Sequence, residues 1–114
     1  MARAEKIKDA TLRSGVEEAY GQLRAGDPSG AVATLADAFG DLLVRHPELL
    51  EFSTTVRGRA FPLVARWPAF GANLVLDPER AAPPRIEFVR QRFAVSEALT
   101  YYEFLVDLAV DQGL

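Results

Sequence analysis

Apolar residues recur at helical spacing in three parts of the chain. The first is predicted to be a helix over residues 3–25, with Gly26 at the left-handed position that often follows a helix. Its apolar side is formed by Leu12, Val16, Ala19, Tyr20 and Leu23. Gly15 lies inside this stretch and lowers helix propensity by about 1 kcal/mol relative to alanine, so the residues before it are expected to fray.

A second helix is predicted over residues 28–46. Asp27 and Pro28 are typical of an N-cap and of the first helical position. His46 precedes a proline, which predicts the end of the helix there. The apolar side of this helix is formed by Val32, Leu35, Ala36, Phe39, Leu42 and Leu43. Because few residues separate the two helices, we expect them to form an antiparallel hairpin.

The C-terminal part of the chain is predicted to be a helix over residues 96–111, with Ser96 as its N-cap. Apolar residues cover two of its sides. One side carries Leu99, Tyr102, Leu105, Val106 and Ala109, and another carries Tyr101, Phe104 and Leu108. A helix that is apolar on two sides lies either at the centre of the core or under a partner.

The middle of the chain loses the helical period after residue 54 and is rich in proline. We expect Asn73 to Leu76 and Arg85 to Val95 to be antiparallel strands joined by Asp77 to Pro84. A helix from residue 86 onward is the alternative, because the apolar residues there also fit a helical stripe.

These elements predict an α+β fold that is mainly helical, built as a single domain over residues 1–114. It has an N-terminal antiparallel helical hairpin, a short β-hairpin in the middle and a C-terminal core helix, and an all-α bundle is the alternative. Residues 19–47, with the Gly26-Asp27 turn, Ala31 and the closing Pro47, resemble one helical pair of the tetratricopeptide type. The second helix here is about one turn longer and no second copy follows, so the resemblance implies a helical hairpin alone.

The composition excludes several classes of site. The chain has 114 residues, of which 49% are hydrophobic and 25% charged, and this is enough to build a core without cross-links. It contains no cysteine, so disulfides and cysteine-ligated metals are excluded. It has no secretory signal, and no apolar run approaches the roughly 20 residues that cross a bilayer. We therefore expect a cytoplasmic protein that does not bind membranes.

Charge is distributed along the chain in three blocks. Residues 1–55 carry a net charge of −3, residues 56–93 a net charge of +4, and residues 94–114 a net charge of −4. Arginine binds carboxylate and phosphate groups bidentately, and tryptophan stacks on flat groups, so the middle block suggests a binding site for a partner or an anion. The predicted site consists of Arg57, Arg59, Arg66, Trp67, Arg90 and Arg92. The alternative is that these arginines pair with acidic helices of the same molecule and that Trp67 lies in the core.

Candidate catalytic and metal-binding groups are few. His46 is the only histidine, and we interpret it as a cation at the C-terminal end of its helix. Asp37 and Asp41 share a helix face at i, i+4 spacing, as do Glu103 and Asp107. Neither pair has the Glu-x-x-His elements of carboxylate-bridged metal bundles. We therefore predict no catalytic residue, no metal and no cofactor.

Three functions fit this pattern. The favoured one is a non-enzymatic protein–protein interaction module, a small subunit or adaptor of a bacterial assembly that binds a protein partner or self-associates. The first alternative is a nucleic-acid-binding accessory protein that uses the central arginines and Trp67, although the negative overall charge does not favour it. The second alternative is a binder of, or enzyme for, a small anionic ligand. The direction in which the central arginines point distinguishes the three.

Overall fold

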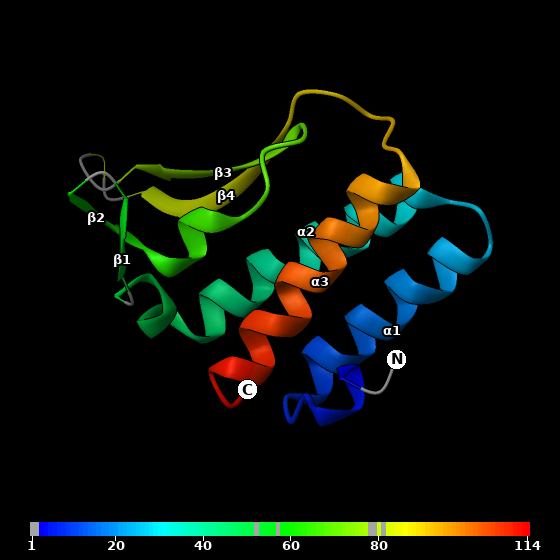
Figure 1. Cartoon of the computed structure of the whole chain (residues 1–114), viewed down its shortest axis with the longest axis horizontal. Helices are drawn as coiled ribbons and strands as arrows, with labels where there is room; N and C mark the ends of the chain where they lie inside the picture. Colours follow the sequence, from blue (N-terminus) through cyan, green and yellow to red (C-terminus); the bar gives the residue numbers. More distant parts are fainter. Residues whose placement is uncertain (1–2, 52, 57, 78–79, 81) are drawn as a thin grey trace.

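Three helices pack together, and two β-hairpins cover one side of them (Figure 1). The fold is given by a computed structural model that describes residues 3–51, 53–56, 58–77, 80 and 82–114, with residues 53–56 and 59–61 described by their backbone alone. The helices are α1 (Ala10–Arg24), α2 (Pro28–Arg45) and α3 (Val95–Asp111), and the short 3₁₀ helices are η1 (Ala4–Lys6), η2 (Pro47–Leu50) and η3 (Leu63–Arg66). The strands are β1 (Ser53–Val56), β2 (Arg59–Pro62), β3 (Ala72–Asp77) and β4 (Ala82–Phe88). The predicted α+β, mainly helical fold is thus confirmed.

The α1–α2 hairpin forms as predicted, and its turn uses the expected residues. Gly26 has a φ of 79°, and the carboxylate of Asp27 accepts a hydrogen bond from the backbone N–H of Gly30 at 2.9 Å. The helices approach closely at Gly15, where an added Cβ would lie 3.1 Å from the Cβ of Ala38. Helix α1 continues on both sides of Gly15. The missing side chain of this glycine leaves room for the close approach of Ala38.

The predicted start of the first helix is wrong by several residues. The helix begins at Ala10, because the carboxylate of Asp9 caps it by accepting a hydrogen bond from the N–H of Leu12 at 2.9 Å. Upstream of the cap the chain forms η1 and then turns Ile7 into the core, where its side chain is only 1% exposed. This packing separates η1 from α1.

Helix α3 lies at the centre of the core, which is the first of the two positions that its two apolar sides predicted. On one side Tyr102 contacts Tyr20 of α1, with ring centroids 5.7 Å apart. On another side Tyr101 and Phe104 both contact Trp67, with centroids 4.6 and 5.7 Å away. Both sides are therefore covered largely from within the molecule.

The predicted N-cap of α3 at Ser96 is wrong. The helix begins at Val95, and Ala94 occupies the cap position. Alanine has no side-chain acceptor, and the first turn is held instead by the carboxylate of Glu97, which accepts a hydrogen bond from the N–H of Ala94 at 2.9 Å. This interaction starts the helix earlier than a serine cap would.

The middle segment contains two β-hairpins where one was predicted. Strands β3 and β4 pair antiparallel, with Ala72 opposite Phe88, so the strand interpretation of the segment after Arg85 is confirmed and the helical alternative is wrong. The strand begins earlier than predicted, at Ala82, and ends at Phe88 rather than Val95, where the chain turns toward α3. The second hairpin, β1–β2, was not predicted, and Gly58 lies between its strands with a φ of 78°.

Tyr101 and Trp67 fasten the β3–β4 hairpin to the helices. The hydroxyl of Tyr101 accepts hydrogen bonds from the N–H groups of Phe70 and Ala72, at 3.0 and 3.3 Å, and lies 3.3 Å from the Ala72 carbonyl, to which it can donate. The indole N–H of Trp67 donates to the same carbonyl at 2.6 Å. The Trp67 ring also stacks on Phe39 of α2, with centroids 4.4 Å apart. These contacts place η3 beside α3.

Candidate functional site

The predicted site residues whose side chains the structure describes do not form one cluster. Trp67 is 4% exposed and belongs to the aromatic core, as the alternative interpretation had it. Arg57 lies outside the described residues, and of Arg59 only the backbone is described, as part of β2. Arg66 and Arg92 are exposed.

Arg90 joins the β3–β4 hairpin to the start of α3. Its guanidinium pairs with the carboxylate of Glu97 and lies 4.9 Å from the centroid of the Phe93 ring. Its aliphatic stem lies against Gly71, where the φ of 115° favours glycine and an added Cβ would approach the stem to 2.5 Å. The pKa of Glu97 is lowered by the hydrogen bond from the backbone of Ala94 and by Arg90. Arg90 thus has a structural role.

Two further arginines of the positive block pair with nearby acids rather than with the terminal helices. Arg80 lies 3.4 Å from Asp77, and Arg85 lies 2.8 Å from Glu87. Among the carboxylates of α3, Glu97 pairs with Arg90, whereas Asp107 and Asp111 pair with a residue from the other end of the chain. The guanidinium of Arg3 contacts both Asp107, at 2.7 Å, and Asp111, at 3.2 Å.

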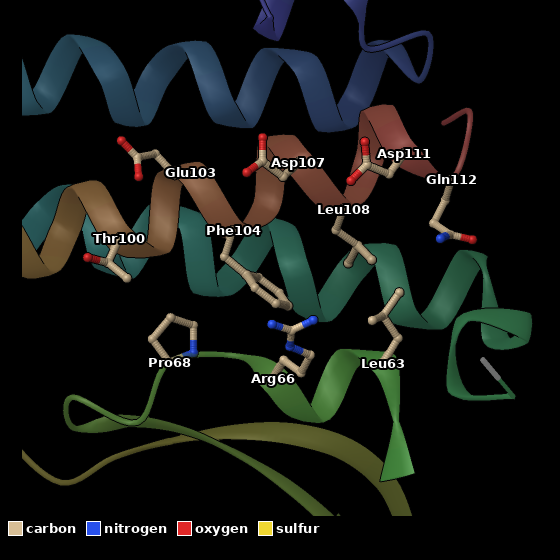
Figure 2. Close-up of a pocket in the computed structure, with 10 residues that line it drawn as sticks. All are labelled: Leu63, Arg66, Pro68, Thr100, Glu103, Phe104, Asp107, Leu108, Asp111 and Gln112. Atoms are coloured by element: carbon tan, nitrogen blue, oxygen red, sulfur yellow. The ribbon is translucent and has the colours of Figure 1, made fainter. Parts of the chain in front are cut away.

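A groove runs between η3 and α3, with a volume of about 490 Å³ (Figure 2). We call it the η3–α3 groove. It is lined by Leu63, Arg66, Pro68, Thr100, Glu103, Phe104, Asp107, Leu108, Asp111 and Gln112. Of the four predicted site residues whose side chains the structure describes, Arg66 is therefore the one in this lining.

Apolar and charged groups are segregated in the η3–α3 groove. Arg66 points toward Phe104 and Leu108, whereas the carboxylates of α3 point away from it (Figure 2). Within the described part of the chain, the Arg66 guanidinium makes no ion pair. The one hydroxyl of the described lining, that of Thr100, donates to the carbonyl of Ser96 at 2.9 Å. The groove thus combines an apolar wall with a guanidinium that pairs with no described carboxylate.

His46 lies in a charged cluster where the start of α1 meets the end of α2. Its Nε2 is 3.3 Å from the carboxylate of Asp9, and its Nδ1 is 3.1 Å from that of Glu48. Asp9 also pairs with Arg45. Burial alone would raise the pKa of Asp9, but hydrogen bonds from Leu12, Arg45 and His46, with the charge of Arg45, lower it to about 2. The cluster thus connects the start of α1 with the end of α2.

Other features of the described residues limit the chemistry of the molecule. Among residues 3–51, 53–56, 58–77, 80 and 82–114, no group of three or more acidic or histidine side chains is arranged to hold a metal ion. Within the same ranges, no helix has the length and apolarity required to span a bilayer. An apolar hollow of about 600 Å³ lies under the middle segment, and the only charged side chain in its described lining is Asp77. An anionic ligand would find no arginine among those lining residues.

No family model, curated protein or solved structure matches the chain. The groove must therefore be interpreted from its own geometry. Sequence reasoning missed the part of the lining that α3 contributes, although the second apolar side of that helix, with Phe104 and Leu108, was a signal for it. Leu63 carried no comparable signal, because its place depends on the 3₁₀ turn of η3.

Proposed function

We propose that this chain is a non-enzymatic protein–protein interaction module, a small subunit or adaptor that docks a partner protein along the η3–α3 groove. The observation that carries the proposal is the exposed guanidinium of Arg66 on an apolar wall formed by Leu63, Phe104 and Leu108. Arginine and aromatic side chains are the groups that most often anchor protein interfaces.

The other groups of the η3–α3 groove support binding rather than catalysis. Its titratable side chains, Arg66, Glu103, Asp107 and Asp111, are all exposed to solvent. Two of these carboxylates are paired with Arg3, and the Thr100 hydroxyl is engaged by the helix backbone. This arrangement offers contact surface and charge to a partner.

The nucleic-acid alternative loses its stacking group in this geometry. The Trp67 ring lies in the core, between Phe39 and Tyr101, and a base cannot stack on it without unfolding that cluster. Arg90 is engaged with Glu97, and Arg85 with Glu87. A polyanion would therefore meet few free cations among the described arginines.

The proposal is tested by site-specific photo-cross-linking in the cells that make the protein. A photoreactive amino acid replaces Thr100 in the η3–α3 groove or Ser14 in the hollow between α1 and α2, two exposed helical positions with hydroxyl side chains. We expect a discrete cross-linked protein from position 100 and none from position 14. Mass spectrometry of the product then identifies the partner.

The cross-link should disappear in Arg66→Glu and persist in Arg92→Glu, because Arg92 is exposed but lies outside the groove. Equal cross-linking from both faces, or none from position 100, would contradict the proposal. A product made of two copies of this chain would show instead that the groove is a self-association surface.

A further inference from the structure

We infer that the partner segment of the η3–α3 groove is acidic: a short peptide that places an aspartate or glutamate on Arg66 beside a large apolar side chain. The inference rests on the proposed function, because it names the occupant of the same groove. It is argued from the charges around the groove and from the shape of its apolar wall.

Arg66 selects for a carboxylate. Its exposed guanidinium faces the apolar side chains of Phe104 and Leu108, so a bound peptide would exclude water there and strengthen a charge-assisted hydrogen bond. A guanidinium matches the two oxygens of a carboxylate with two parallel N–H donors. The described residues supply no such partner, so an incoming carboxylate would complete the site.

Arg3 reduces the repulsion between the neighbouring carboxylates and an acidic partner. Asp107 and Asp111 line the groove, and unpaired they would repel a second negative charge. The guanidinium of Arg3 bridges both of them, at 2.7 and 3.2 Å. Arg3 thus reduces the negative charge of the α3 ridge, and Glu103 remains as the acidic lining residue beyond the reach of this pair.

The apolar wall supplies the second half of the recognition. Leu63 and Phe104 are half-buried and line the groove with Pro68, so a leucine, methionine or phenylalanine of the partner can remove them from water. A nucleic-acid strand is a poorer match, because its evenly spaced phosphates require a track of cations, and Arg66 is the one cation in the described lining of the groove.

The experiment selects short random peptides, displayed on phage, against the wild-type protein. The enriched peptides should combine an aspartate or glutamate with a large apolar residue, and they should protect the photoreactive group at position 100 from cross-linking. In fluorescence polarisation, Arg66→Ala should weaken a selected peptide by about tenfold to a hundredfold. Arg92→Ala is the matched control and should leave its affinity unchanged.

Reversing the charge at position 66 gives the most specific test. Arg66→Glu should abolish binding of the acidic peptide and accept the same peptide with its acidic residue changed to lysine. Arg3→Ala should weaken the acidic peptide by a few-fold and strengthen the lysine peptide, since it uncovers Asp107 and Asp111.

The outcomes separate this inference from the function on which it rests. Peptides that occupy the groove without enrichment of acidic residues, or that bind Arg66→Ala as well as the wild type, overturn the inference and leave the docking function standing. Failure to select any peptide that protects position 100 contradicts both. Binding of a single-stranded oligonucleotide that depends on Arg66, with no peptide selected, would assign the groove to nucleic acid.

Discussion

The helical layer and the β-hairpin middle are held together by different kinds of interaction. In α1, α2 and α3 the stabilising contacts are apolar side chains with almost no exposure, such as Val16, Leu35 and Leu105, each at 0%. The middle segment buries fewer apolar side chains, such as Val64 and Ala72 at 0%, and adds specific contacts made by the hydroxyl of Tyr101 and the ring of Trp67. The helices are thus joined along whole faces, whereas the middle segment is joined at fewer positions and borders the η3–α3 groove.

The largest expected effect comes from Phe39→Ala, which removes the ring that joins the two regions. Phe39 is 0% exposed and stacks on Trp67, so its loss should reduce the free energy of unfolding by about 3–5 kcal/mol. Urea denaturation monitored by Trp67 fluorescence measures it. Val44→Ala, on the same helix but 73% exposed, should change it by less than about 0.5 kcal/mol. A similar loss in both variants would show that Phe39 does not join the regions.

Tyr101→Phe should separate the hairpin from the helices at lower cost. Without the hydroxyl, the N–H groups of Phe70 and Ala72 lose their acceptor, which should cost about 1–3 kcal/mol. Hydrogen exchange at these two amides should accelerate while exchange in the middle of α1 is unchanged. Tyr20→Phe, at a half-buried tyrosine of α1, is the control with little expected effect. Uniform acceleration over both regions would contradict the distinction between them.

Asp9→Asn probes a charged contact within the helical layer. The folded pKa of Asp9 is lowered from 3.8 to about 2, so its charge stabilises the fold above pH 3.8, and this contribution is lost as the pH falls through about 2. Asparagine keeps the cap but loses the charge, and the variant should be less stable by roughly 1–2 kcal/mol near neutral pH. Urea unfolding across pH should show the two proteins converging in acid. A difference independent of pH would exclude the ion pairs as its cause, and the exposed Asp37→Asn is the control.

The smallest stability effect is expected for Arg3→Ala. Its contacts with Asp107 and Asp111 are at least half exposed, with side-chain exposures of 50%, 52% and 66% for the three residues. Such pairs contribute at most about 1 kcal/mol and are screened by salt. Thermal unfolding should therefore show a small decrease in Tm that vanishes at high salt. A large decrease that survives salt would show that η1 is held to α3 by Arg3 itself.

The helices could be predicted because their signals are local. The Asp27-Pro28 start and the stripe from Val32 to Leu43 act within one or two turns, and α2 begins and ends within one residue of the prediction. The β1–β2 hairpin was missed because its strands are only four residues long and lack clear alternation. The start of α1 was misplaced because the burial of Ile7 depends on distant elements.

The candidate site was predictable only in part. The sequence identified the arginine-rich segment. Its adjacent residues Arg66 and Trp67 differ, however, because Arg66 is exposed and Trp67 is buried. A 3₁₀ turn decides this difference, and short apolar runs do not reveal such a turn. The pairing of Arg3 with Asp107 spans 104 positions, and no local pattern encodes a contact of that separation.

We propose that the partner binds in the η3–α3 groove, where the middle segment meets α3. The most direct measurement is a titration of the isotope-labelled protein with the selected peptide, or with the partner identified by cross-linking, followed by amide chemical shifts in NMR spectra. We expect shifts concentrated at Leu63, Arg66, Phe104 and Leu108, with Ser14 and Asp37, in the hollow between α1 and α2, unchanged. Shifts that cluster on the outer faces of α1 and α2, with the groove residues unmoved, would contradict the account.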